Sequence, residues 1–127
     1  MAEKATALLA LWNDVDPALD TQYNEWHAKE HVPERLTVPG ILWAYRYGRS
    51  EADGTPRYLT LYGLRDAAVL DSEPYQRLLR EPTPMSRTMR PALCNVSRWV
   101  CTLHELPSFE HRNGLAVWTT AGESAGH

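Results

Sequence analysis

The segment Tyr-Asn-Glu-Trp-His-Ala-Lys-Glu-His-Val-Pro-Glu-Arg, residues 23–35, is the most informative part of this chain of 127 residues. It places two histidines, His27 and His31, beside two large aromatic side chains on about three turns of a predicted helix. A structural helix in a small domain rarely carries so many titratable groups next to its aromatic face. Because Pro33 disfavours helical geometry at the residue before it, we expect Val32 to leave the helix, which then ends near His31.

Strand-like runs on both sides of this helix define the order of the fold. Asp16 and Pro17 suit the N-cap and the first position of a helix that runs from Pro17 to about His31. The predicted order β-α-β-β-α-β is the ferredoxin-like arrangement, an α+β fold in which a four-stranded antiparallel sheet carries both helices on one face. We expect this domain over residues 1–106, and a C-terminal tail, 107–127, that is partly flexible, adds a strand or contacts a partner. The expected strands cover residues 6–12, 41–48, 57–64 and 93–103, and the expected second helical region covers 67–80, with one more turn at 85–90.

Most of these strands carry apolar or aromatic side chains on both faces. In the first strand, for example, Leu9 and Leu11 alternate with Leu8 and Trp12. Both helices cover the same face, so the other apolar face needs a different cover. Closed twofold dimers are the commonest oligomers, and we therefore predict a homodimer whose two sheets pack face to face into a barrel-like shell.

Composition and charge restrict the class of protein. The apolar share of 43%, the charged share of 23% and the formal net charge of −3 are ordinary for a soluble domain, and no block of lysine and arginine suggests nucleic-acid binding. No apolar run approaches a membrane span, and the N-terminus lacks signal-peptide features, so we expect a cytoplasmic protein that binds no membrane. Cys94 and Cys101 lie seven residues apart on one predicted strand and point to opposite faces, so we expect two buried or half-buried thiols, with a catalytic cysteine as the alternative.

The chain resembles the dimeric α+β barrel superfamily, and within it the EthD-like and similar small proteins. In such families a histidine near the end of the first helix often faces the cavity between helix and sheet, and His31 matches that place. Two positions depart from the expected pattern, because His27 replaces an aromatic residue and Asn13 replaces a threonine. The superfamily hosts enzymes of several classes and a shared fold does not select among them. The resemblance covers residues 6–103 and rests on Asp14-Val15-Asp16-Pro17, Trp26-x-x-x-Glu30-His31-Val32-Pro33-Glu34-Arg35-Leu36, Val38-Pro39-Gly40, the Pro56–Tyr62 strand and Pro82-Thr83-Pro84.

His31 is the leading candidate for a general acid or base, since imidazole titrates near neutral pH. Glu30 or Glu34 could orient it through a hydrogen bond. His27 and Asn13 are the other predicted catalytic residues, and the helix dipole offers His31 a purely structural role as the alternative. The predicted substrate-binding residues are the aromatics Trp26, Tyr23, Tyr45, Tyr58 and Trp43, which could equally be core or interface material. Four arginines, Arg46, Arg57, Arg90 and Arg98, could hold a carboxylate or simply lie at the surface.

We expect no cofactor and no metal. The chain has no glycine-rich phosphate loop and no G-x-S-x-G elbow. The string from His27 to His31 does fit the H-x-x-E-H pattern of inverted zinc peptidases, but no third ligand is evident downstream. Haem bound through His31 or His104 is a further alternative.

These residues favour a cofactor-independent enzyme that transfers protons on a small aromatic or polyketide-like molecule. Cyclisation, isomerisation and dehydration are the expected reaction types, with His31 moving the proton and Asn13, Tyr45 or Tyr58 holding a developing oxyanion. A cofactor-free monooxygenase of an electron-rich ring is the nearest alternative, because that reaction also begins with deprotonation. A protein that binds a small ligand without catalysis is the alternative from another class.

Overall fold

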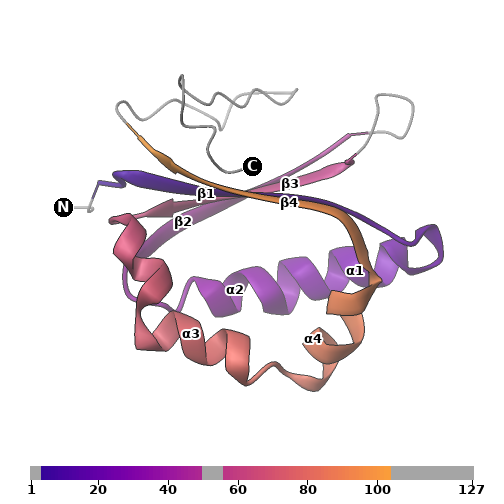
Figure 1. The fold of residues 1–127 in the computed structure, drawn as a ribbon. Coiled ribbons are helices and arrows are strands. Elements are labelled where there is room, and N and C mark those ends of the chain that lie inside the picture. The colour runs from indigo at the N-terminus through magenta and orange to yellow at the C-terminus, as the bar shows by residue number, and fades with distance from the viewer. Residues whose placement is uncertain (1–3, 50–55, 104–127) are drawn as a thin grey trace.

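A computed structural model describes residues 4–49 and 56–103 of the chain. A four-stranded antiparallel sheet, in the order β2-β3-β1-β4, carries the helices on one face (Figure 1). The predicted α+β fold and its β-α-β-β-α-β order are therefore confirmed. The predicted tail, 107–127, lies outside the described residues. The strands are β1 (Ala7–Val15), β2 (Ile41–Gly48), β3 (Tyr58–Leu64) and β4 (Leu93–Thr102).

Two groups of short helical elements follow β1 and β3. No helix among the described residues is long and apolar enough to cross a membrane. The first group has a 3-10 turn (Pro17–Leu19), α1 (Asp20–Trp26), a π-helical turn (His27–His31) and α2 (Val32–Arg35). The second has a 3-10 turn (Ala67–Asp71), α3 (Glu73–Arg80), α4 (Pro84–Met89) and a 3-10 turn (Arg90–Ala92).

The first helical segment continues past Pro33, so the prediction that it ends near His31 was wrong. Val32 keeps helical angles, φ −68° and ψ −47°, and its N–H donates to the carbonyl of His27, five residues back. A proline inside an α-helix cannot donate to the carbonyl four residues back, and its ring collides with that carbonyl. The wider π-turn just before Pro33 provides the space that an α-turn lacks, and such turns are frequent at functional sites.

Apolar side chains line both faces of the sheet, as predicted. The face under the helices includes Leu9, Tyr62 and Leu64, and the opposite face includes Leu59 and Leu61. Gly63 lies on that opposite face, where an added Cβ would come 2.1 Å from the Trp43 ring, so only glycine lets this ring lie flat on the strand. The partly buried residues on the opposite face are Trp12, Trp43, Tyr45, Tyr47, Trp99 and Leu103.

The strand β1 runs three residues beyond its predicted end because a buried carboxylate supports it there. Asp14 accepts from the backbone N–H of Arg57 at 2.6 Å and from the side-chain amide of Asn95 at 2.7 Å. The pairing of β1 with β4 shifts register between Trp12 and Asp14, and Asn95 has a φ of 51°. At this bulge Asn13 pairs with β3 alone, and alternation with Leu9 and Leu11 places its side chain on the helix face of the sheet.

Candidate active site

Between the sheet and the first helical segment, His27 is held as a neutral imidazole of one tautomer. Its side chain is almost fully buried, and the Nε of Arg46 donates to its Nδ1 at 2.7 Å. Because Nδ1 accepts this hydrogen bond, the ring proton sits on Nε2, which lies 3.4 Å from the hydroxyl of Thr60. His27 is therefore committed at both nitrogens, so its role is to position neighbouring groups.

A chain of hydrogen bonds links this imidazole to the N-terminal end of α1. The second edge of the Arg46 guanidinium donates to Asn24 at 2.7 Å. Asn24 in turn donates to the hydroxyl of Tyr58 at 3.1 Å, and that hydroxyl donates to Asp20. Arg46 thus lies between two neutral acceptors, and it makes no ion pair within the part of the chain that the structure describes.

His31 differs from His27 because its Nδ1 is buried and has no hydrogen-bond partner. The two imidazole rings stack with centroids 5.0 Å apart and planes inclined by 22°, and His31 also packs on Trp26 at 4.6 Å. The hydroxyl of Tyr62, a residue only 1% exposed, is the second buried polar atom without a partner on the helix side of the sheet. Unsatisfied buried polar atoms are costly, and a bound ligand or ordered water commonly accounts for them.

Burial and positive charge keep both histidines neutral. Burial, followed by the charges of Arg46 and Arg35, lowers the pKa of His27 from 6.5 to about 3. Burial, followed chiefly by the charge of Arg35, lowers the pKa of His31 from 6.5 to about 2. Burial also raises the pKa of Tyr62, while Arg35 and Arg46 oppose that rise. The guanidiniums of Arg35 and Arg46 therefore act on His27, His31 and Tyr62 alike, so these three groups share one electropositive interior.

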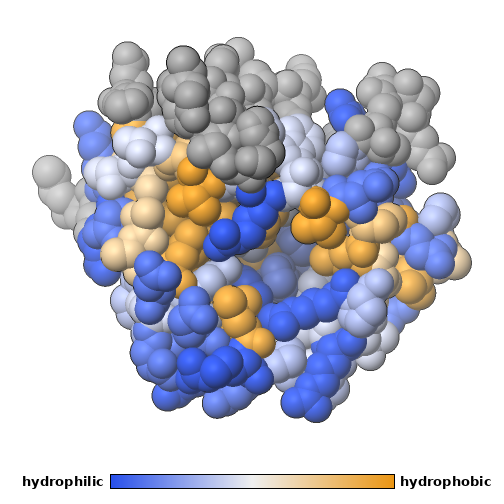
Figure 2. Space-filling view, in the orientation of Figure 1, coloured by the Kyte–Doolittle hydropathy of each residue, from blue (hydrophilic) through white to orange (hydrophobic). Residues whose placement is uncertain are grey.

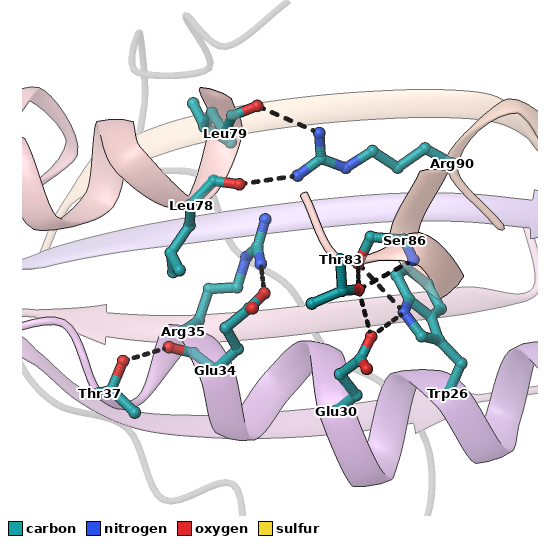
Figure 3. Close-up of polar contacts among 10 residues, drawn as sticks. All are labelled: Trp26, Glu30, Glu34, Arg35, Thr37, Leu78, Leu79, Thr83, Ser86 and Arg90. Carbon is teal, nitrogen blue, oxygen red and sulfur yellow. Dashed lines mark hydrogen bonds and ion pairs between the residues drawn. The ribbon is translucent and has the colours of Figure 1, made fainter. Parts of the chain in front are cut away.

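The two glutamates do not orient His31, which corrects the sequence prediction. Glu30 accepts from Trp26 at 3.1 Å and from the hydroxyl of Thr83 at 2.7 Å (Figure 3). Glu34 accepts from Arg35 at 2.8 Å. Both carboxylates are thus engaged by other donors, whereas His31 packs against the rings of Trp26 and His27.

Two arginines approach this interior from different elements. Arg35, in α2, is 5% exposed, and its NH1 pairs with Glu34. Arg90 follows α4 and donates to the carbonyls of Leu78 and Leu79 at the end of α3, at 3.3 and 3.4 Å (Figure 3). The charge of Arg35 lowers the pKa of Arg90, after the effect of burial, so the two guanidiniums are close enough to repel each other.

The sequence predictions did not select Arg35 or Tyr62 as site residues. Arg35 lies four residues after His31, a spacing that places two residues on one helix face. That signal was lost because the helix was expected to end before Pro33. Tyr62 alternates with Leu61 on β3, and a partner-free hydroxyl leaves no trace in a sequence.

The face of the molecule formed by β4 and the layer of α3 and α4 is hollowed near its centre (Figure 2). Hydrophobic side chains flank the hollow, and hydrophilic ones lie within and below it. On this edge strand Val96 is 59% exposed and Arg98 is also exposed, so the helices leave part of β4 uncovered. A small molecule would meet a mixed apolar and charged surface there.

The structure brings most of the predicted site residues to the helix face of the sheet. Tyr23 packs against Trp26, His27 and Tyr58, and it donates to Asn13 at 3.2 Å. The amide of Asn13 also donates to the carbonyl of Asp14 at 3.3 Å, so both of its polar ends are engaged. Tyr58, bound to the first helix, is engaged as well.

Trp43 and Tyr45 do not share this interior, so the prediction that they line one pocket with His31 was wrong. Successive side chains of a strand point to opposite faces. Both rings belong to the apolar cluster on the face away from the helices, whereas Ala44 and Arg46 face the helices. The described residues contain no group of three or more histidine, cysteine, aspartate or glutamate side chains placed to hold a metal ion.

Comparisons with known proteins bear on the fold alone. No protein-family model and no curated protein matches the chain. The structure is similar to the crystal structure of HapK from Hahella chejuensis, with a TM-score of 0.54 and 13% sequence identity, over 88% of this chain and 99% of that one. At this identity the likeness supports a small α+β fold and carries no activity with it.

Proposed function

We propose that this protein is a cofactor-independent enzyme that moves a proton on a small aromatic or polyketide-like substrate, with His31 as the general base. The observation that carries the proposal is the buried, partner-free Nδ1 of His31 inside an aromatic, electropositive interior. A neutral imidazole offers a lone pair to an acidic C–H or O–H bond, and the negative charge that develops on the substrate beside it raises the pKa of His31 from about 2, so that the imidazole can hold the proton.

In the proposed reaction the substrate ring lies beside Trp26 and His31. The C–H bond next to a carbonyl breaks, its proton goes to the imidazole, and its electron pair moves onto the carbonyl oxygen as an enolate. The positive charges of Arg35 and Arg46, which already act on His31, favour the negative charge of this oxyanion. Return of the proton at another atom completes an isomerisation. In a cyclisation, the enolate carbon attacks a second carbonyl carbon of the same molecule, the C=O π bond of that carbonyl breaks, and the alkoxide so formed takes the proton back from the imidazolium.

His27 acts in this scheme as a positioning residue. Arg46 fixes its tautomer and its ring stacks on His31, so the catalytic imidazole is held in one orientation. The π-turn that carries both histidines gives this stacking its geometry.

We propose further that the chain belongs to the dimeric α+β barrel superfamily and forms a homodimer through the sheet face away from the helices. The aromatic cluster around Trp12, Trp43 and Trp99 supports this proposal, since such residues are enriched in interfaces. Light scattering after gel filtration tests it: a mass of twice 14.4 kDa is expected. A mass of one chain would contradict the dimer and leave the His31 interior unaffected.

Proton exchange tests the function without knowledge of the natural substrate. A panel of aryl ketones with acidic C–H bonds is incubated in D₂O, and loss of the C–H signal is followed by proton NMR. Wild type should accelerate exchange for members that fit, and His31→Gln should reduce the rate by roughly 10²- to 10⁴-fold, the usual contribution of a general base. Lys29→Gln is the matched control, because Lys29 lies on the same turn with its side chain 74% exposed.

Other outcomes separate the alternatives. Equal exchange by wild type and His31→Gln contradicts the proposed role of the imidazole. Tight binding of panel members without any exchange favours a non-catalytic binding protein. Oxygen consumption that accompanies exchange identifies a cofactor-free oxygenase, which also begins with deprotonation.

A further inference from the structure

We propose that the interior beside His31 binds a carboxylate, so that the ligand is a monoanionic aryl carboxylate. The inference rests on the proposed function, because it names the chemical class of ligand for the same site. It is carried by the unbalanced guanidinium of Arg46, the buried guanidinium of Arg35 and the two partner-free polar atoms.

The first step concerns charge. The guanidiniums of Arg35, Arg46 and Arg90 all act on His31. The carboxylates of Glu30 and Glu34 lie in the same layer, as Figure 3 shows. Both carboxylates are already engaged, Glu30 by Trp26 and Thr83 and Glu34 by Arg35. At the N-terminal end of α1, the charges of Asp20 and Arg57 offset each other across 3.4 Å, and both histidines are neutral.

Among the described residues, Arg46 therefore has neutral acceptors and no carboxylate partner. A buried or half-buried charge without a counter-ion is costly, and it is expected to have a partner in the functional state. A carboxylate of a ligand supplies the partner that Arg46 lacks. The planar fork of a guanidinium also fits a carboxylate well.

The second step concerns hydrogen bonds. Nε and NH2 of Arg46 are taken by His27 and Asn24, and NH1 of Arg35 is taken by Glu34. Arg46 also acts on the hydroxyl of Tyr23 through a hydrogen bond, whereas among the described residues only the NH1 group of the Arg35 guanidinium has an acceptor. The hydroxyl of Tyr62 adds a buried donor that lacks an acceptor. A group that only accepts hydrogen bonds, such as a carboxylate, matches this set of donors.

The third step concerns shape. Trp26 and the stacked imidazoles of His27 and His31 form a cluster of flat rings, with centroids 4.6 to 5.8 Å apart, next to the partner-free Nδ1 of His31. Flat rings of this kind suit another aromatic ring in offset or tilted packing. An aryl group on the rings, with its carboxylate on the arginines, uses both features at once.

Sodium benzoate and benzamide test this inference by calorimetric titration of the full-length protein. The two probes have nearly the same shape and differ in charge. We expect benzoate to bind at least about tenfold more tightly than benzamide. Arg46→Gln should abolish that preference, and Arg46→Lys should retain part of it. Arg77→Gln is the matched control, since it removes the same charge from an α3 side chain that is 63% exposed.

A second variant guards against a folding defect. Tyr62→Phe removes only the partner-free hydroxyl, and it should weaken benzoate by roughly three- to tenfold while leaving benzamide less affected. Equal affinity for the two probes, no benzoate binding at millimolar concentration, or an unchanged preference in both Arg46→Gln and Tyr62→Phe would overturn the inference.

The two proposals fail separately. His31→Gln should abolish proton exchange but keep most of the preference for benzoate, because the arginines supply the charge. Proton exchange on neutral ketones without any preference for benzoate refutes the carboxylate site and leaves the proposed function standing. Preference for benzoate without exchange on any substrate has the opposite consequence.

Discussion

Acidification below about pH 6.5 should destabilise this protein through His27 and His31. Both groups have a folded-state pKa far below the ordinary 6.5, at about 3 and about 2. Above pH 6.5 the imidazoles are neutral in the folded and in the unfolded chain, so the stability is fully present there. Below it the unfolded chain binds protons that the folded chain excludes, and stability falls until the pH approaches the folded pKa values.

The size of the effect follows from linkage. Well below pH 6.5, each further pH unit lowers the free energy of unfolding by about 1.4 kcal/mol per buried imidazole, and near pH 6.5 the slope is smaller. Between about pH 7.5 and about pH 5.5, each histidine therefore lowers the free energy of unfolding by about 1.4 kcal/mol, and the pair lowers it by about 3 kcal/mol. That is a large fraction of the stability of a small domain.

Urea denaturation at several pH values between these limits measures the effect, with the doubly substituted His27→Gln, His31→Gln protein as the reference. The wild type should lose about 3 kcal/mol more than this variant over the window. The difference between the two proteins cancels the other histidines and every carboxylate. Parallel pH dependences of wild type and variant would refute the assignment of buried, neutral imidazoles.

Four further substitutions test individual contacts by thermal or urea unfolding. Tyr62→Phe should leave stability unchanged or raise it by up to about 1 kcal/mol, because the lost hydroxyl has no partner. Tyr23→Phe should cost about 1 kcal/mol, because the hydrogen bond from its hydroxyl to Asn13 is lost. Equal losses of stability in both variants would contradict the two assignments. Glu30→Ala should cost about 1 to 3 kcal/mol, since it removes a charged acceptor and leaves the donors of Trp26 and Thr83 only the hydroxyl of Ser86. A neutral result would show that this carboxylate does not hold α4 in place. Gly63→Ala should cost about 1 to 3 kcal/mol because its methyl group meets the Trp43 ring, and unchanged stability would mean that the ring is free to move.

The fold was predictable because strand periodicity and the position of turns are local signals. The β2 strand matches its expected range, 41–48, and β3 and β4 differ by one residue at one end. The end of β1 was missed because Asp14 is held by Arg57 and Asn95, which come from distant parts of the chain. A contact that closes a strand from elsewhere in the fold cannot be read from the residues of the strand itself.

The site was predictable only in part, for a similar reason. His27 and His31 stand out locally, and the structure places them ring on ring. Their different roles depend on Arg46, which is 19 residues from His27 in sequence. Pro33 misled the prediction because a π-turn overcame its usual effect on a helix, and Arg35 was consequently overlooked.

The pairing of aromatics with a face of the sheet shows a third limit. Trp43 and Tyr45 are two residues apart on β2, so the sequence predicts that their side chains share one face of the sheet. Which face the helices cover is decided by the packing of Ile41 and Ala44 under the helices. The sequence of β2 alone does not predict which face this is, and the structure has Trp43 and Tyr45 on the face away from His31.

The titration of the His31 imidazole is the most direct test of the central claim. Nitrogen-15 NMR of the two imidazole nitrogens, assigned with His31→Gln, follows its protonation with and without benzoate. We expect a neutral ring throughout the range from about pH 7.5 to about pH 5 and a change in its nitrogen shifts when benzoate binds. A ring that titrates near 6.5 and does not respond to benzoate would be an ordinary exposed histidine, and the proposed base would be lost.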